Sequence, residues 1–287
     1  MIYETPRFYP AGDRYIEVEL GNEMSFDLNI AVHALAAAIR AADLPGVIEL
    51  IPEMASMQIS YDADRMSFAD VCREVEQLYA LSSGAGDIEL DSRLINIPIL
   101  YFDPWTEACI ADYRSRVTDK TEDPELLCAL NNLAGRSHLK RLHAAPEYWV
   151  AALGFWPGLC SLMPLDPRSR IVAPKYNPPR SWTPKGAIGI GGAITCIYPD
   201  RTPGGYQIFA RTPVPIWDRE QKLPAFRDNL ALFRPGDRVR FIPIERDEYD
   251  YIEAKVSEGR YVHSVVDYQK FSMANYRTWL RKLEHAA

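Results

Sequence analysis

The chain has 287 residues, enough for one large domain or two ordinary ones, and its 47% hydrophobic and 25% charged residues are typical of a soluble globular protein. The formal net charge of −7 argues against nucleic acid as a main partner, and no apolar run approaches the length that spans a bilayer. The N-terminus lacks a basic-then-apolar signal pattern, so a cytoplasmic location is expected. Five cysteines without a CxxC pair indicate neither a disulfide framework nor a zinc site.

The first ninety residues predict a ferredoxin-like domain of β-α-β-β-α order. Short apolar or alternating segments, typical of strands, occur at 15–20, 46–51 and 57–61. Two segments carry apolar side chains at helical spacing, one after Asp27 and one after Ser67, and both of these residues can cap a helix. With residues 88–90 or a later segment as the last strand, the order matches the split βαβ unit.

A linker is predicted at Ser82-Ser83-Gly84-Ala85-Gly86, the only stretch of flexible-linker composition. It divides the chain into an α/β domain at 1–86 and a second domain at 87–287. The second domain is expected to begin with a strand at 94–101. Two helices follow, at about 104–117 and 124–133, and Asp123 is the expected cap of the second.

The rest of the second domain predicts a closed or nearly closed barrel. Short β-rich segments separated by turn residues occur at 148–153, 187–190, 194–198, 206–211, 238–243 and 260–267. A C-terminal helix capped by Ser272 is expected to bury one face, formed by Tyr276, Trp279, Leu280 and Leu283. The predicted fold class is therefore α+β.

Rigid loops in the second domain are the expected place for a site. Residues 157–215 hold 11 of the 22 prolines, and proline fixes φ. Between Arg168 and Lys185 there are five cations and no acid; the cations are Arg168, Arg170, Lys175, Arg180 and Lys185. They form either a solvated basic loop or a site for a carboxylate or phosphate.

Several common catalytic motifs are absent, among them the P-loop, the dinucleotide-type GxGxxG, HExxH and GxSxG. Gly189-Ile190-Gly191-Gly192 is too short and apolar for a phosphate loop, and it predicts close packing in a barrel. His138 and His143 are five residues apart, which is poor spacing for two ligands on one helical face, so no metal is expected.

A composite motif identifies a resemblance that covers nearly the whole chain. Its parts are Lys175-Tyr176-Asn177-Pro178-x-Arg180-x-Trp182-Thr183-Pro184, Gly189-Ile190-Gly191-Gly192-Ala193 and Cys196-Ile197-Tyr198. The combination resembles the carboxyltransferase region of urea carboxylase. The wider family includes the B subunit of 5-oxoprolinase, the subunit called allophanate hydrolase subunit 1, and a sporulation-kinase inhibitor. The resemblance implies a ferredoxin-like N-terminal part followed by a cyclophilin-like β-barrel.

Departures from the family patterns make the chain intermediate between two members. Leu159 and Ile194-Thr195-Cys196 stand where 5-oxoprolinase-type members usually carry an aromatic and Gln-Thr-Gly, which favours urea carboxylase. Pro199 and Pro213 are closer to the 5-oxoprolinase side.

The resemblance implies a subunit of a biotin-dependent carboxyltransferase that acts on urea or a related small nitrogen compound, such as guanidine. No Met-Lys biotin-carrier motif and no ATP-binding glycine loop occur. Carboxybiotin would therefore come from a separate carrier, ATP would be used only on a partner subunit, and the other half of the transferase would be another chain. The alternatives are the B subunit of 5-oxoprolinase, in ATP-dependent hydrolysis of 5-oxoproline, and a non-catalytic kinase-inhibitor-like binding protein.

Such a transfer requires groups that hold the carboxylate and a base that takes a proton from the acceptor nitrogen. Lys175 and Arg180 are expected to hold the carboxylate or ureido oxygen. Asn177 suits a urea-like acceptor because its amide offers a donor beside an acceptor, and His143 is the only plausible imidazole base in the region. The expected substrate pocket is completed by Tyr198, Gln207, Arg211 and Thr195.

Most of these residues also have a structural explanation. Tyr198 can be a core residue with a satisfied hydroxyl, and His143 can be a structural hydrogen bonder or cap. Arg211 can tie a strand to a neighbouring loop through backbone carbonyls. Lys175 has the weakest structural explanation, since a cation between prolines is not needed for folding.

Overall fold

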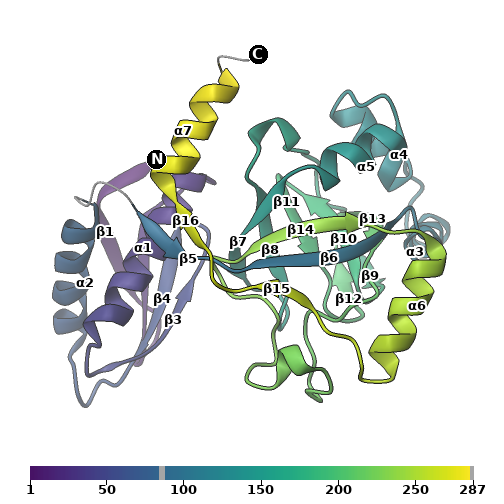
Figure 1. Ribbon diagram of the computed structural model, residues 1–287. Helices are drawn as coiled ribbons and strands as arrows, with labels where there is room; N and C mark the ends of the chain where they lie inside the picture. Colours follow the sequence, from purple (N-terminus) through teal and green to yellow (C-terminus); the bar gives the residue numbers. More distant parts are fainter. Residues whose placement is uncertain (84–87, 285–287) are drawn as a thin grey trace. The chain divides into compact units, whose positions relative to one another are not determined.

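The computed structural model describes residues 1–83 and 88–284, which form two compact units (Figure 1). The first unit contains Met1–Ser92 and the C-terminal segment from Tyr268, and the second is Arg93–Asp267. This division corrects the predicted ranges 1–86 and 87–287, because the C-terminal segment belongs to the first unit. Strand β5 (Glu89–Asp91) forms backbone hydrogen bonds with β16 (Lys270–Ser272), which holds that segment in place. The predicted boundary at residue 86 lies outside the described residues.

The first unit has the predicted ferredoxin-like order, with one exchange at the edge of its sheet. Its antiparallel sheet has the order β1-β2-β4-β3 (Ile2–Pro10, Tyr15–Gly21, Ser56–Tyr61 and Val47–Pro52). Helices α1 (Phe26–Ala42) and α2 (Phe68–Ser83) share a core with alternate residues of these strands. The edge place expected for 88–90 belongs to β1, since residues 89–91 pair with β16 instead.

The helix caps of the first unit differ in part from expectation. The amide of Leu28 donates to Oγ of Ser25 at 3.4 Å, so Ser25 and not Asp27 caps α1. Ser67 caps α2 as expected, since its Oγ accepts from the Asp70 amide at 3.2 Å. Helix α7 (Met273–Glu284) begins after Ser272, but it does not bury the predicted apolar face. Only Met273 of α7 is buried within this chain, and Trp279 is 37% exposed.

The second unit contains the predicted closed barrel, with seven strands. Its order is β6-β13-β10-β11-β8-β7-β14 (Leu94–Tyr101, Gln207–Arg211, Ala187–Gly191, Ile194–Ile197, Cys160–Pro164, Glu147–Leu153 and Arg238–Pro243). Strand β6 closes the barrel, because it pairs with β14 along one edge and with β13 at its C-terminal end along the other. The predicted strand at 260–267 is shorter, since β15 is only Ser264–Val266 and pairs with the first half of β6.

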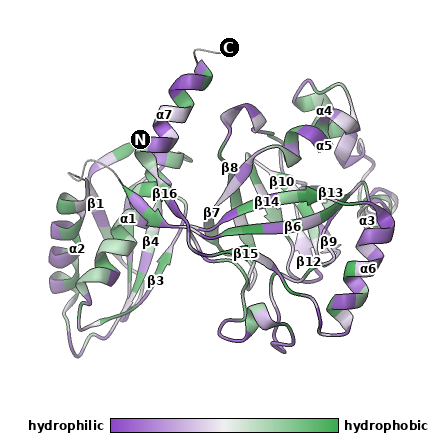
Figure 2. Cartoon of the chain, viewed as in Figure 1, coloured by the Kyte–Doolittle hydropathy of each residue, from purple (hydrophilic) through white to green (hydrophobic). Residues whose placement is uncertain are grey.

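Helices and a two-stranded ribbon surround this barrel. The helices are α3 (Pro104–Arg116), α4 (Asp123–Leu130), α5 (Arg136–Ala144) and α6 (Arg246–Ser257). The ribbon pairs β9 (Arg180–Thr183) with β12 (Thr202–Gly204). Short 3-10 turns lie at Pro167–Ser169 and Pro224–Phe226. Figure 2 shows that β10 and β13 are largely hydrophobic whereas α6 is largely hydrophilic. Among the described residues, no helix has the length and apolar character needed to cross a membrane.

Candidate functional site

A cavity of about 410 Å³ opens on the second unit. Its walls come from the segment that leads into β10, the segment that follows β13, and the C-terminal half of α6. Gly186 makes the close approach of the first two segments possible. It has φ +80°, and a Cβ at this position would overlap the carbonyl oxygen of Thr212. The Gly186 carbonyl also accepts a hydrogen bond from the Thr212 amide at 2.9 Å, which holds these two segments together.

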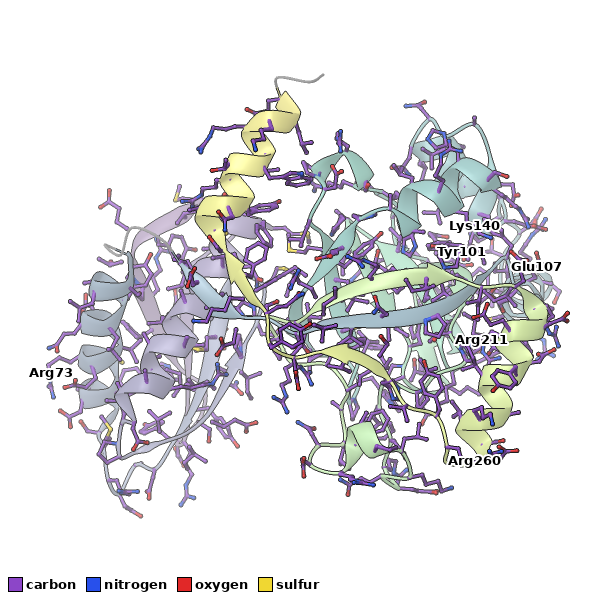
Figure 3. All side chains as sticks on the ribbon, in the orientation of Figure 1. Arg73, Tyr101, Glu107, Lys140, Arg211 and Arg260 are labelled. Atoms are coloured by element: carbon purple, nitrogen blue, oxygen red, sulfur yellow. The ribbon has the colours of Figure 1, made fainter. Side chains whose placement is uncertain are left out.

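Arg211 lines this cavity, and its guanidinium is held from several sides. The guanidinium carbon lies 4.5 Å from the centroid of the Trp105 ring and 5.5 Å from that of Tyr249. Its Nε donates to the carbonyl oxygen of Lys185 at 2.8 Å, and NH1 lies 3.6 Å from Oε1 of Glu253. Figure 3 shows Arg211 between the barrel and α6. A guanidinium fixed in this way can receive an oxyanion with little loss of side-chain entropy.

Both signs of charge line the cavity. The cations that line it are Lys185, Arg211, Arg219 and Lys222, and the carboxylates are those of Asp200, Asp218, Glu220 and Glu253. Tyr198 also contributes to the wall, but its side chain is buried and its hydroxyl accepts from the Tyr206 amide at 3.4 Å. Burial raises the pKa of Tyr198, so its hydroxyl stays protonated at neutral pH.

A second polar cluster is built around Asp123, whose side chain is completely buried. Oδ1 accepts from the hydroxyl of Tyr176 and forms an ion pair with Lys120, while Oδ2 accepts from the Ile208 amide at 2.7 Å. NH1 of Arg180 lies 4.0 Å from Oδ2. The ring of Tyr176 lies between the two cations, 4.1 Å from Lys120 Nζ and 4.4 Å from the Arg180 guanidinium carbon. Burial raises the pKa of Tyr176, and the adjacent carboxylate raises it further.

Comparison with known proteins agrees with this architecture. The family model described as "Carboxyltransferase domain, subdomain C and D" matches residues 6–227. The chain belongs to this carboxyltransferase family.

Relatives that match this chain carry different names. The chain is 31% identical over 278 residues to urea amidolyase of Saccharomyces cerevisiae, which covers 91% of this chain and 15% of that protein. It is 32% identical over 251 residues to the B subunit of 5-oxoprolinase from Bacillus subtilis, covering 83% of this chain and 92% of that protein. The structure of Kluyveromyces lactis urea carboxylase superposes with a TM-score of 0.85 at 25% identity. That match covers 98% of this chain and 25% of the larger protein.

The five cations that the sequence analysis singled out do not form one cluster in the structure. Arg168 pairs with Asp166, and Arg170 is exposed. Arg180 is 2% exposed and turns inward to Asp123, and only Lys185 lines the cavity beside Arg211.

The side chains of the composite motif at 175–180 therefore lie in two different environments. Tyr176 and Arg180 face the Asp123 cluster, whereas Lys175 and Asn177 are exposed. Nζ of Lys175 lies 5.4 Å from the centroid of the Tyr206 ring, and neither Lys175 nor Asn177 lines the cavity.

Two of the expected pocket residues have structural contacts. Gln207 is buried, donates from Nε2 to the Pro174 carbonyl at 2.7 Å, and accepts at Oε1 from Lys120 at 3.1 Å. Thr195 is buried on β11, where its side chain interacts with the Tyr148 hydroxyl. Neither residue lines the cavity.

His143 is placed in the barrel core and not at the cavity, which corrects its expected position. It is completely buried between the rings of Phe209 and Phe241, with centroids at 4.9 and 4.7 Å. Nδ1 lies 2.8 Å from the hydroxyl oxygen of Tyr101. Burial lowers the pKa of His143 to about 3. A buried, neutral imidazole that does not line the cavity fits the structural alternative considered in the sequence analysis.

The sequence missed four residues that build these sites, namely Trp105, Asp123, Tyr176 and Glu253. Asp123 was expected to cap α4, but Glu122 occupies the cap position. The Asp123 carboxylate instead accepts hydrogen bonds from the Tyr176 hydroxyl and from the amide of Ile208 on β13. The signal for Tyr176 was present, since it lies within the composite motif. Within residues 1–83 and 88–284, no three His, Cys, Asp or Glu side chains gather closely enough to hold a metal ion.

Proposed function

We propose that this chain is a carboxyltransferase subunit that transfers a carboxyl group from carboxybiotin to urea or a related small nitrogen compound. The observation that carries the proposal is Arg211, which is held in the cavity by Trp105, Glu253 and the Lys185 carbonyl. Carboxyl transfer develops negative charge on the carboxylate and on the ureido oxygen of biotin, and a fixed guanidinium stabilises such charge without reorganising.

The residues around the cavity fit both reactants. Carboxybiotin, when presented by a separate carrier, supplies the activated carboxyl group. Arg211 and Lys185 would hold its carboxylate, since both are basic residues that line the cavity. Asp200 and Glu253 would accept hydrogen bonds from the N–H groups of an amide-like acceptor.

We assign Lys175 and Asn177 to the approach of the carrier or of the partner subunit. Both side chains are exposed, and the loop that carries them is anchored by the buried contacts of Tyr176 and Arg180. A rigid loop presents polar groups to an incoming reactant at little entropic cost. Biotin loading and ATP use are proposed to take place on other chains.

The urea carboxylase assignment is supported by the extent of the structural likeness. The Kluyveromyces lactis enzyme matches 98% of this chain with a TM-score of 0.85. The chain spans only a quarter of that protein and 15% of the Saccharomyces cerevisiae urea amidolyase.

A role as the B subunit of a 5-oxoprolinase is the second candidate. The observation that favours it is the Bacillus subtilis relative, of which this chain covers 92% at 32% identity. In that role the chain would act in the ATP-dependent hydrolysis of 5-oxoproline together with other subunits.

One experiment separates the two candidates. The tagged chain is purified from its own host and the co-purifying proteins are probed with streptavidin. The recovered complex is then assayed for ATP- and bicarbonate-dependent carboxylation of urea and of guanidine, and for 5-oxoproline hydrolysis. A biotinylated partner with carboxylation of urea or guanidine supports the first proposal. Hydrolysis of 5-oxoproline by a complex without biotin would replace it with the second.

A further inference from the structure

A second cavity, of about 320 Å³, is formed by α3 together with the ribbon strand β9. The two cavities have lining residues that are neighbours in the sequence. Asp200 lines the first cavity, and the next residue, Arg201, lines the second. The proposed carboxyl transfer does not use this second cavity.

Guanidinium groups dominate the lining of the second cavity. Arg116, Arg180 and Arg201 contribute three cations, and Asp112 is the one carboxylate among the lining residues. Cys109 also lines it, but burial raises the pKa of its thiol to about 11, so it adds no negative charge at neutral pH. The protein as a whole carries a net charge of −7, so this concentration of positive charge is local.

The carboxylate of Asp112 is already engaged at both oxygens. Oδ1 pairs with Nε of Arg116 at 2.7 Å, and Oδ2 accepts from Nε1 of Trp182 at 2.9 Å. Arg201 stacks on Trp182, with its guanidinium carbon 4.5 Å from the centroid of the ring. The charge of Arg201 therefore has no carboxylate of its own among the lining residues.

Arg180 adds a buried charge that is only partly compensated. Its closest carboxylate, Asp123, lies 4.0 Å away and is in closer contact with Lys120. Its hydrogen bonds go to neutral oxygens, the carbonyl of Tyr206 at 2.7 Å and Oγ1 of Thr183 at 3.2 Å. A buried cation without a full counter-charge is costly, and an anion in an adjoining cavity reduces that cost.

We propose that the second cavity is a binding site for a small oxyanion, a phosphate or a carboxylate, separate from the site of carboxyl transfer. Arg180, 2% exposed, lies at its base and supplies the field, while the exposed Arg116 and Arg201 at its mouth supply the hydrogen-bond donors. Guanidinium groups bind both kinds of oxyanion through paired N–H donors.

The test is calorimetric titration of the full chain with inorganic phosphate and, separately, with acetate, at constant ionic strength set with chloride. Arg201→Gln removes one donor from the mouth without disturbing the buried Arg180. It is expected to weaken binding about tenfold, the loss of roughly one charge-assisted contact. Arg168→Gln, which removes an equal charge from an exposed pair outside the cavity, is the matched control and should bind as the wild type does.

A second variant tests the sign of the effect. Asp112→Asn keeps an acceptor for the Trp182 indole but removes the one carboxylate of the lining, so it is expected to strengthen binding about fivefold. The anion that binds more tightly identifies the source, phosphate or carboxylate. Equal affinities in the wild type and in both cavity variants would overturn the proposal, as would the absence of binding of either anion at about 10 mM.

Discussion

The hydroxyl of Tyr176 donates a hydrogen bond to Oδ1 of Asp123, and this contact joins the motif-bearing loop to the first turn of α4. The carboxylate is completely buried and is shared with Lys120 and Arg180. The loop is therefore anchored by charge inside the protein, although its sequence reads as a basic surface loop.

Removing the Asp123 charge should destabilise the second unit strongly. Asp123→Asn leaves Lys120 and Arg180 without a counter-charge in a buried site, and we expect a loss of about 3–5 kcal/mol in the free energy of unfolding. Tyr176→Phe removes one hydrogen bond to a charged group and should cost about 1.5–3 kcal/mol. Denaturation with guanidinium chloride measures both losses of stability. Tyr268→Phe is the control, because Tyr268 is 85% exposed. Wild-type stability of Asp123→Asn would show that the cluster does not hold the loop.

Replacing Arg211 tests the transfer site. Arg211→Lys keeps the charge but loses the planar group that stacks on Trp105 and donates to the Lys185 carbonyl, so kcat/KM of the assembled complex should fall at least about 100-fold. Arg246→Lys is a matched control, because Arg246 also stacks on Trp105, at 4.9 Å, but does not line the cavity. Equal activity of the two variants would remove Arg211 from the proposed site.

Lys175 tests the proposed approach of the carrier. Lys175→Ala should abolish turnover of the assembled complex while the free energy of unfolding changes by less than about 0.5 kcal/mol, because the side chain is exposed. Arg170→Ala, another exposed cation of the same region, should keep normal turnover. Steady-state assays and thermal unfolding provide the two readouts. Normal activity of Lys175→Ala contradicts the assignment.

His143 predicts a pH dependence of stability. Burial lowers the pKa of the folded-state imidazole to about 3, while in the unfolded chain it is about 6.5. Below pH 6.5 the unfolded state binds a proton that the folded state does not. Stability should therefore fall by about 1.4 kcal/mol per pH unit from this group, down to the folded-state pKa.

The variant His143→Gln removes the titrating group from the core. Denaturation between pH 7 and pH 4 should show a shallower loss of stability relative to its own value at pH 7. His138→Gln, on the same helix but only partly buried, should keep the wild-type slope. An unchanged slope in His143→Gln would mean that other groups control the acid sensitivity.

Patterns with a strong local cause were predicted well from the sequence. The barrel strands at 94–101, 187–190 and 238–243 are confirmed, because their apolar character follows from burial in a closed sheet. Close packing is also confirmed at Gly189 and Gly191, but not at Gly192, where a Cβ would meet nothing within 4 Å. A Cβ on Gly191 would overlap the ring of Tyr206, a neighbour that the sequence did not name.

Elements without a strong local pattern were missed. Half of the residues of helix α6 are charged and it buries only Tyr249 and Ile252, and β8 has five residues. Such short elements depend on tertiary packing more than on their own propensity. The edge strand of the first sheet was likewise expected at residues 88–90 or a later segment, whereas β1 holds that place.

By itself, the order of residues determined the α+β class, the barrel and the membership of the carboxyltransferase family, because periodicity and motif spacing are properties of the chain. Only the tertiary structure decided which charged side chains meet. Arg180 turns inward to Asp123, and Arg211 meets Glu253 across the cavity wall. The direction of each side chain depends on how deeply the cation is buried and on which partner folding brings to it. Neither can be inferred from the residues that neighbour it in the sequence.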